Sequence, residues 1–426
     1  MGEPIVLEDF KERVILVGVS EQDGDDAEDS LAELAELVKT AGASVSGTLI
    51  QKRELIHPGT YVGTGKVAEI AELLEHTGAT GIVCDDELSP AQLKNLETML
   101  NTKVMDRTLI ILDIFAARAT TSEGKIQVEL AQLKYRLSRL TGLGRSMSRL
   151  GGGIGTRGPG EKKLEIDRRL INDRIAQLNR ELKEVVKHRE IARAKRERNA
   201  VTVVAIVGYT NAGKSTLLNA ITGAGIPANN RLFDTLDTTT RLLTVSDTLD
   251  VVISDTVGFI RKLPHQLVEA FKATLEELEY ADLLLHVIDL SNPQWAQQAQ
   301  VVDDLIRELK ADHIPCLRVY NKCDLAFSGA LPREKDSVYI SAKTGEGIKR
   351  LLQAVDEKLD KGTRRVTIHL PYDKAGLLDG LYREAKVENV EYGETVDVTA
   401  VCTPRIMGQL KDYIEGWQEE KEDWEQ

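Results

Sequence analysis

Residues 203–219, Val-Val-Ala-Ile-Val-Gly-Tyr-Thr-Asn-Ala-Gly-Lys-Ser-Thr-Leu-Leu-Asn, decide the fold of the chain. The first five are apolar and mostly β-branched, which is typical of a buried strand. The motif G-x-x-x-x-G-K-S follows at residues 208–215, and an amphipathic helical pattern begins at Thr216. A strand, a glycine loop and a helix in this order predict a loop that binds the phosphates of a nucleotide.

The residue types of this loop suit phosphate. Gly208 and Gly213 let the backbone turn, so that successive N–H groups face phosphate oxygens at a helix N-terminus, where the helix dipole favours anions. Lys214 supplies a cation for the β- and γ-phosphates, and the Ser215 hydroxyl can ligate Mg²⁺. We therefore expect the nucleotide to contact Gly208, Tyr209, Thr210, Asn211, Ala212, Gly213, Lys214, Ser215 and Thr216.

A second motif, D-x-x-G, follows two strand-like runs at 242–245 and 251–254. Asp255 can hold the magnesium shell through water, and the N–H of Gly258 can face a γ-phosphate. The motif is weak by itself, but its place behind the glycine loop favours a nucleoside triphosphate. Its expected contacts are Asp255, Thr256, Val257 and Gly258.

Two further motifs indicate the base. Asp324, at the end of Asn321-Lys322-Cys323-Asp324, would accept hydrogen bonds from N1–H and the 2-amino group of guanine. Adenine has neither donor and would leave a buried carboxylate unpaired. In Ser341-Ala342-Lys343 a backbone N–H would lie near guanine O6. The four motifs together predict GTP rather than ATP, with Asn321, Lys322, Cys323, Asp324, Ser341, Ala342 and Lys343 around the base.

Length and composition set broad limits. A chain of 426 residues predicts about two to four domains, and 42% hydrophobic residues is ordinary for a globular protein. The four cysteines form no C-x-x-C pair, so we expect neither a disulfide framework nor a zinc site. The sequence has no signal segment and no apolar run of membrane-spanning length, which predicts a soluble cytoplasmic protein without membrane insertion.

The net charge of −13 hides a strong asymmetry. Residues 134–200 carry nineteen Lys or Arg and eight Asp or Glu, so this segment has a charge of 19 − 8 = +11 and the rest of the chain carries −13 − 11 = −24. Such a distribution favours a basic arm that meets a polyanion while the body stays acidic. The alternative is a long solvated helix with basic residues on its outer face.

The pattern along the chain predicts a multidomain α/β protein. Strands and helices alternate to about residue 120, apolar residues at helical spacing predict two antiparallel helices, and short strands with two helices follow the nucleotide-binding region. We expect an N-terminal α/β domain at 1–125, a basic helical hairpin at 126–199, a Ras-like P-loop domain at 200–362 and a small C-terminal α/β domain with an acidic tail at 363–426.

The tip of the expected hairpin is rich in glycine. Residues 142–161 contain eight glycines in twenty residues, which predicts a long flexible loop rather than a helix. Glycines allow close approach to a nucleic-acid backbone, and arginines make bidentate phosphate contacts. Arg145, Arg149 and Arg157 are therefore candidate RNA contacts.

With these motifs the chain resembles the HflX family of GTPases, within the Obg–HflX group. The resemblance rests on residues 63–66, 86–92, 127–133, 151–155 with 158–161, and 208–215, and covers most of 12–365. It implies a GTPase that binds the ribosome, chiefly the large subunit, with the hairpin reaching toward the RNA of the peptidyl-transferase region. It also implies a role in splitting or rescuing stalled ribosomes under stress.

The resemblance places a switch loop at Phe233, Asp234, Thr235, Leu236 and Asp237, where Thr235 would be a second magnesium ligand beside Ser215 and the water-mediated Asp255. Thr235 is preferred over Thr238, Thr239 and Thr240. The chain departs from the family here, because the family usually has a small residue at the place of Asp234 and a proline at that of Thr238.

The residue after D-x-x-G lacks the side chain that usually assists hydrolysis. Many GTPases have a Gln there that positions the attacking water, but Phe259 cannot form a side-chain hydrogen bond. Lys214, Asn211 and Gly258 can assist the transition state, yet we expect slow hydrolysis that the ribosome stimulates in trans. In related GTPases an Asn at the place of Asn211 helps to bind K⁺, which is a second route.

Two other functions stay open. A GTP-switched scaffold could regulate a protein partner, although it would not need an arginine-bearing glycine tip. A P-loop nucleotide or nucleoside kinase is disfavoured, because residues 321–324 serve base recognition and no phosphate-acceptor lid is evident. We expect a monomer that binds GTP or GDP with Mg²⁺ and does not bind DNA.

Overall fold

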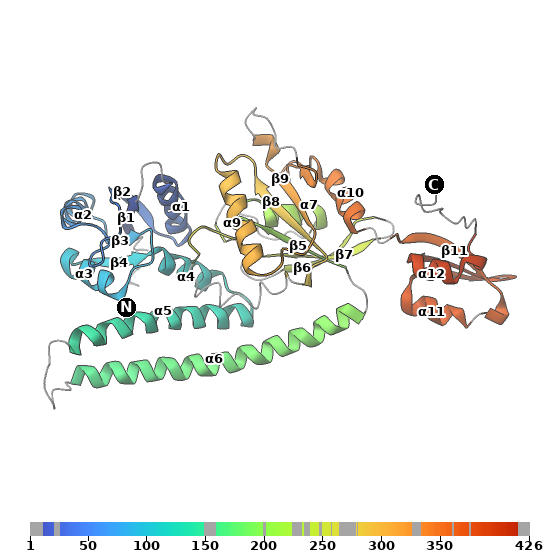
Figure 1. Cartoon of the computed structure of the whole chain (residues 1–426), viewed down its shortest axis with the longest axis horizontal. Helices are drawn as coiled ribbons and strands as arrows, with labels where there is room; N and C mark the ends of the chain where they lie inside the picture. The colour runs from blue at the N-terminus through green and yellow to red at the C-terminus, as the bar shows by residue number, and fades with distance from the viewer. Residues whose placement is uncertain are drawn as a thin grey trace, which may run out of the picture.

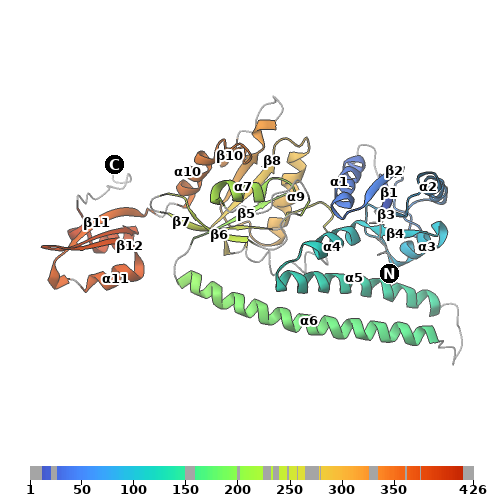
Figure 2. The same cartoon turned by 180° about the vertical axis from the view of Figure 1, so that it is seen from behind.

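The computed structural model describes residues 12–20, 26–148, 159–198, 202–223, 232–233, 239–246, 249–256, 258–263, 278, 280–325, 334–359, 362–374 and 376–415. An N-terminal domain and a central domain lie side by side, a long helical hairpin runs along both, and a C-terminal domain lies beyond the central one (Figure 1 and Figure 2). The expected fold class is confirmed. The expected domain boundaries stay a prediction.

The N-terminal domain contains β1 (Arg13–Ser20), α1 (Ala27–Thr40), β2 (Ser44–Lys52), α2 (Thr64–Thr77), β3 (Gly81–Cys84), α3 (Pro90–Leu100), β4 (Lys103–Asp106) and α4 (Arg107–Arg118). Its strands form a parallel sheet of order β2-β1-β3-β4. Val14 and Leu16 of β1 share a core with α1 and α4, whereas Ile15 and Val17 share another core with α2 and α3. Helices on both faces explain why the central strands are apolar throughout.

The sequence pattern did not predict helix α4, which follows β4 directly. Asp106 ends β4 and caps α4, because its carboxylate accepts the N–H of Leu109 at 2.9 Å. The helix packs between the sheet and its neighbours and is buried over much of its surface, so its apolar residues show no single amphipathic stripe.

The hairpin consists of α5 (Ser122–Ser148) and α6 (Pro159–Arg198). Arg174 of α6 forms a bidentate ion pair with Glu129 of α5, at 2.8 and 3.0 Å. The prediction of a loop over all of 142–161 was wrong at both ends, since α5 continues to Ser148 and α6 begins at Pro159. Single glycines cost a helix only about 1 kcal/mol each, and Pro is favourable at a helix start.

The central domain contains β5 (Thr202–Gly208), α7 (Lys214–Thr222), β6 (Thr239–Thr244), β7 (Asp250–Asp255), β8 (Leu283–Asp289), α9 (Trp295–Glu308), β9 (Cys316–Asn321), the short 3₁₀ helix η2 (Cys323–Leu325), β10 (Ser337–Tyr339) and α10 (Ile348–Leu359). The sheet order is β10-β9-β8-β5-β7-β6, and only β6 runs antiparallel to its neighbour. Helix α9 packs on one face, with α7 and α10 on the other. The strand order reverses beside β5, and a ligand is expected at the carboxyl ends of strands at such a point.

The C-terminal domain contains β11 (Arg364–Leu370), η3 (Tyr372–Lys374), α11 (Leu377–Glu384), β12 (Lys386–Tyr392), β13 (Val396–Cys402), α12 (Pro404–Gln409) and η4 (Lys411–Tyr413). Its strands form an antiparallel sheet of order β11-β13-β12. The last helix of the domain is short, because α12 ends at Gln409 and gives way to a 3₁₀ turn. Gly408 in the last turn of α12 disfavours its continuation.

One apolar core extends from the N-terminal domain into the central domain. Phe115 of α4 meets Phe233 edge to face, with ring centroids 4.7 Å apart. Tyr209, Phe259 and Ile260 belong to the same core. The two domains are therefore packed through residues that flank the expected phosphate site.

Candidate functional site

The glycine loop lies between β5 and α7 at the carboxyl edge of the sheet. Gly208 is required because a Cβ there would lie 2.3 Å from the carbonyl oxygen of Val287. Gly213 has φ +95°, and its Cβ would lie 2.3 Å from Nδ2 of Asn321. Both positions exclude larger residues for steric reasons.

Lys214 is buried beneath this loop. Its ammonium group donates to the carbonyl oxygens of Gly208 at 3.1 Å and Tyr209 at 2.8 Å. Burial lowers the pKa of Lys214 to about 8, although the nearby Asp255 carboxylate raises it. A bound phosphate would favour the charged form again, so the side chain is placed to pair with an anion.

An oxygen donor pair lies next to the lysine. The Ser215 hydroxyl donates to Oδ2 of Asp255 at 3.0 Å, and the buried Thr256 hydroxyl donates to the Ile206 carbonyl at 2.7 Å. The helix α7 presents Ser215 and the end of β7 presents Asp255, so elements distant in sequence bring the two together. Hydroxyl and carboxylate oxygens are hard ligands that suit Mg²⁺.

The segment after D-x-x-G is joined to the glycine loop by backbone hydrogen bonds. The N–H of Thr210 donates to the Phe259 carbonyl at 2.7 Å, and the N–H of Phe259 donates to the Gly208 carbonyl at 3.1 Å. Phe259 is buried, and a Cβ on Gly258 would lie 2.9 Å from Nζ of Lys214. The backbone of Gly258 thus lies directly against the lysine.

The residues expected around the base come together on the other side of the loop. Asn321 is buried; its amide donates to the Ala212 carbonyl at 2.8 Å and accepts the Ala342 N–H at 3.0 Å. Lys322 donates to Asp289 at 2.6 Å. Ser341 is buried as well. The side chains that reach solvent here include those of Asp324 and Lys343, while Cys323 is half-buried.

Several sequence-predicted residues have other surroundings or lie outside the described residues. The hydroxyl of Tyr209 points to the N-terminal domain, and Phe233 packs on Phe115. Asn211 is exposed with φ +60°, and Thr216 is half-buried on α7. Arg145 lies on α5, but its side chain is not described. Outside the described ranges lie Asp234, Thr235, Leu236, Asp237, Val257, Arg149 and Arg157.

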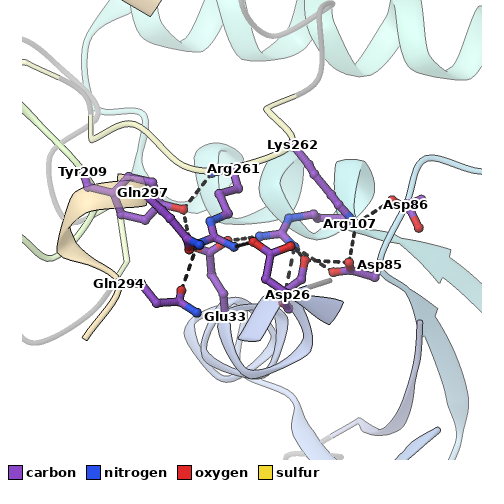
Figure 3. Close-up of polar contacts among 11 residues, drawn as sticks. Asp26, Glu33, Asp85, Asp86, Arg107, Tyr209, Arg261, Lys262, Gln294 and Gln297 are labelled. Carbon is purple, nitrogen blue, oxygen red and sulfur yellow. Dashed lines mark hydrogen bonds and ion pairs between the residues drawn. The ribbon is translucent and has the colours of Figure 1, made fainter. Parts of the chain in front are cut away.

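Sequence reasoning missed a set of charged residues beside the site. Figure 3 shows Glu33, Asp85, Asp86 and Arg107 of the N-terminal domain facing Tyr209, Arg261 and Lys262 of the central domain. Arg261-Lys262, so close behind D-x-x-G, and Asp85-Asp86 at a strand end were visible in the sequence, but nothing there indicated that they meet.

The described residues lack two further kinds of feature. Across the ranges given above, no cluster of three or more His, Cys, Asp or Glu side chains is arranged to hold a metal ion. Among the same residues, no helix combines the length and apolar character needed to cross a membrane.

Four family models match the chain in order. They are GTP-binding GTPase N-terminal at residues 28–116, GTP-binding GTPase Middle Region at 118–196, 50S ribosome-binding GTPase at 203–322 and HflX C-terminal domain at 330–424. The chain is 54% identical to the GTPase HflX of Lacrimispora saccharolytica over 98% of this chain and 100% of that protein. It is 45% identical to the GTPase HflX of Escherichia coli, covering 89% and 90%.

Solved structures give a more distant likeness. A crystal structure of SsGBP in complex with GDP has a TM-score of 0.45 and 25% identity, and the match covers 81% of this chain and 98% of that one. With a glycine loop, an adjacent Ser–Asp pair and a base-side Asn assembled at one sheet edge, and with relatives this similar over nearly the whole length, the chain belongs to the HflX family of GTPases and hydrolyses GTP.

Proposed function

We propose that this protein binds the ribosome, chiefly the large subunit, in a GTP-dependent way and splits or rescues stalled ribosomes under stress. The match of residues 203–322 to the 50S ribosome-binding GTPase model supports the partner. In this proposal bound GTP permits the protein to bind the ribosome, and hydrolysis of GTP ends that binding.

The observation that carries the proposal is the hairpin. Helix α6 has 40 residues, so at 1.5 Å per residue it is about 60 Å long. Several basic side chains are exposed along it, namely Arg168, Arg169, Arg180, Lys183 and Lys187. A long, exposed basic element on an otherwise acidic chain is suited to a phosphate backbone. We propose that the tip residues Arg145, Arg149 and Arg157 contact ribosomal RNA near the peptidyl-transferase region.

At the nucleotide site we propose that Mg²⁺ is held by Ser215, by Thr235 and, through water, by Asp255. The adjacent oxygens of Ser215 and Asp255 fit this ion. Bound Mg²⁺ would supply positive charge that neutralises the phosphates. Lys214 would pair with the β- and γ-phosphates, and Asp324 would accept the guanine donors.

Catalysis in the isolated chain should be slow, because the buried Phe259 offers no hydrogen bond to water. We propose that the ribosome supplies the missing stabilisation. A K⁺ ion near the exposed Asn211 would be a second source of positive charge. Equal GTP turnover in Na⁺ and K⁺ buffers would exclude that second route.

The proposal is tested by GTP turnover with and without purified large ribosomal subunits. The intact chain is compared with one lacking residues 143–160 and with a full-length variant in which Arg145, Arg149 and Arg157 are changed to Gln. We expect strong stimulation of the intact chain, loss on deletion, and a large reduction in the triple variant. Equal slow turnover in every sample would contradict the proposal and favour a GTP-switched scaffold for a protein partner.

A further inference from the structure

The N-terminal and central domains are joined by a network of charged and polar side chains, which we name the interdomain latch (Figure 3). On the N-terminal domain it comprises Glu33, Asp85, Asp86 and Arg107; on the central domain it comprises Tyr209, Arg261 and Lys262. Every central-domain member lies either in the glycine loop or just behind D-x-x-G.

One arm of the latch holds Lys262. Its ammonium group donates to Asp85 at 2.5 Å and to Asp86 at 2.6 Å. Lys262 has φ +52°, in the left-handed region that is unfavourable for residues other than glycine. Such a conformation persists only where the surroundings impose it and is often found at functional sites. Lys262, four residues after Gly258, has this conformation while its ammonium group contacts the two N-terminal carboxylates.

The other arm holds the glycine loop. The Tyr209 hydroxyl donates to Glu33 at 2.5 Å and accepts the N–H of Arg261 at 2.9 Å. Glu33 also pairs with Arg107, whose side chain is 1% exposed and which donates to Asp85 at 2.7 Å. Arg107 therefore links both arms, because the carboxylates that hold Tyr209 and Lys262 are both paired with its guanidinium group.

The latch adjoins the groups that would distinguish GTP from GDP. In the latched structure, Gly258 lies against Lys214, and Phe259 exchanges backbone hydrogen bonds with the glycine loop. Lys214 and the N–H of Gly258 are the groups that face a γ-phosphate in this class of site. The closed arrangement can therefore serve GTP through both groups, whereas GDP has no γ-phosphate to meet them.

We propose that the interdomain latch stabilises this closed arrangement and thereby makes the protein prefer GTP to GDP. Tyr209 and Lys262 are then positioning residues for the γ-phosphate, and Glu33, Asp85, Asp86 and Arg107 act through them. By linkage, a ligand that binds the latched state more tightly must strengthen the latch to the same degree. GTP thus holds the two domains together more firmly than GDP does.

The latch also extends to the hairpin. Asp106 precedes Arg107 in the chain, is fully buried, and accepts hydrogen bonds from Tyr135 at 2.7 Å and from Arg139, both on α5. It further accepts the N–H of Leu88 at 3.1 Å. The hairpin is consequently fixed to the N-terminal domain, and a change in domain docking would reach it. This inference does not depend on ribosome binding.

The test measures the affinity of the isolated full-length protein for GDP and for a GTP analogue with a β–γ imido bridge. Lys262→Met removes both ion pairs and keeps an unbranched side chain of similar length, whereas Lys262→Arg keeps the charge. Lys349→Met is the matched control, because Lys349 is exposed on α10, which lies away from the N-terminal domain (Figure 1). We expect Lys262→Met to weaken the analogue about five-fold or more relative to GDP. Lys262→Arg should restore most of the preference, and the control should not change it.

A double-mutant cycle tests whether Asp86 acts through Lys262. Asp86→Asn keeps an acceptor for the Tyr61 hydroxyl, which donates to Asp86 at 2.6 Å. If the latch acts as proposed, Asp86→Asn should cost little further preference once Lys262 is Met, because the shared interaction is already lost. Hydrogen exchange gives a second readout: the analogue should protect α4 amides in the wild type and not in Lys262→Met.

Two results would overturn the inference. Unchanged affinities for both nucleotides in Lys262→Met would show that the latch does not sense the γ-phosphate. An equal loss of affinity for both nucleotides would show only general support of the site. Thermal unfolding of each variant establishes that it is folded before binding is compared.

Discussion

Asn321 offers a sharp test of how the nucleotide site is held together. Its side chain is 2% exposed and joins the glycine loop to the base-side loop, through the Ala212 carbonyl at 2.8 Å and the Ala342 N–H at 3.0 Å. Asn321→Ala removes both hydrogen bonds and leaves two buried backbone groups without their partner. The change touches neither the phosphate lysine nor the expected magnesium ligands.

The magnitude follows from these two groups. A buried donor or acceptor that loses its partner costs about 1–3 kcal/mol, and water entering the space left by the side chain reduces the sum to about 2–4 kcal/mol. Because the nucleotide needs both loops in place, its apparent affinity falls with the population of the ordered site. The loss corresponds to a weakening of about 30- to 900-fold in Kd.

The assay is GDP binding to the full-length protein by titration calorimetry, with Asn389→Ala as the control. Asn389 lies on β12 of the C-terminal domain and is exposed, so this variant should bind like the wild type. Wild-type GDP affinity in folded Asn321→Ala would refute the reasoning, because the two loops would then be held by other contacts.

Three further predictions follow from single residues. Gly213→Ala should abolish measurable nucleotide binding. Residue 213 has φ +95°, which disfavours a side chain, and the new Cβ would lie 2.3 Å from Nδ2 of Asn321; binding assays check this. Asp324→Asn should weaken GTP by about 2 kcal/mol or more and favour a xanthine nucleotide, since an amide can donate to the C2 carbonyl of xanthine; competition binding checks the order. His369 should titrate above the usual histidine pKa, because Asp397 accepts its hydrogen bond at 2.7 Å, and NMR should find a lower pKa in Asp397→Asn, where only Glu415 still raises it. The stability from this pair is present below about pH 6.5 and is lost as the pH rises through the raised pKa.

The residues proposed for the nucleotide site could be identified from the sequence because they are set by local physics. Gly208 and Gly213 must be glycine for the loop to pass a neighbouring carbonyl and an amide, and such requirements appear directly as a short motif. The alternation of strands and helices likewise identified the α/β class. Helix α4 was missed because its burial removed the hydrophobic periodicity on which the prediction relied. The loop at the glycine-rich tip was predicted too long, because single glycines do not end a helix.

The interdomain latch could not be predicted for a different reason. Lys262 and Asp85 are 177 residues apart, and Tyr209 and Glu33 are 176 apart. A lysine after a glycine motif, or an aspartate after a strand, is usually a solvated charge, and only the packing of two domains turns these residues into partners. Arg107 is an extreme case, because a basic residue in an apolar helical run became a buried bridge between two carboxylates.

This contrast bears on how the protein can work as a switch. The local motifs assemble the GTP site, but they contain nothing that could transmit the nucleotide state to the hairpin, whose helix α6 is about 60 Å long. Transmitting the nucleotide state to the hairpin requires contacts whose strength depends on the conformation of D-x-x-G. The latch supplies such contacts within four residues of Gly258. Since Asp106 fixes α5 to the same domain that Arg107 joins to the site, two adjacent residues connect the chemistry to the hairpin. A variant that breaks the latch should therefore keep the nucleotide site and lose its effect on the hairpin, which separates this coupling from catalysis itself.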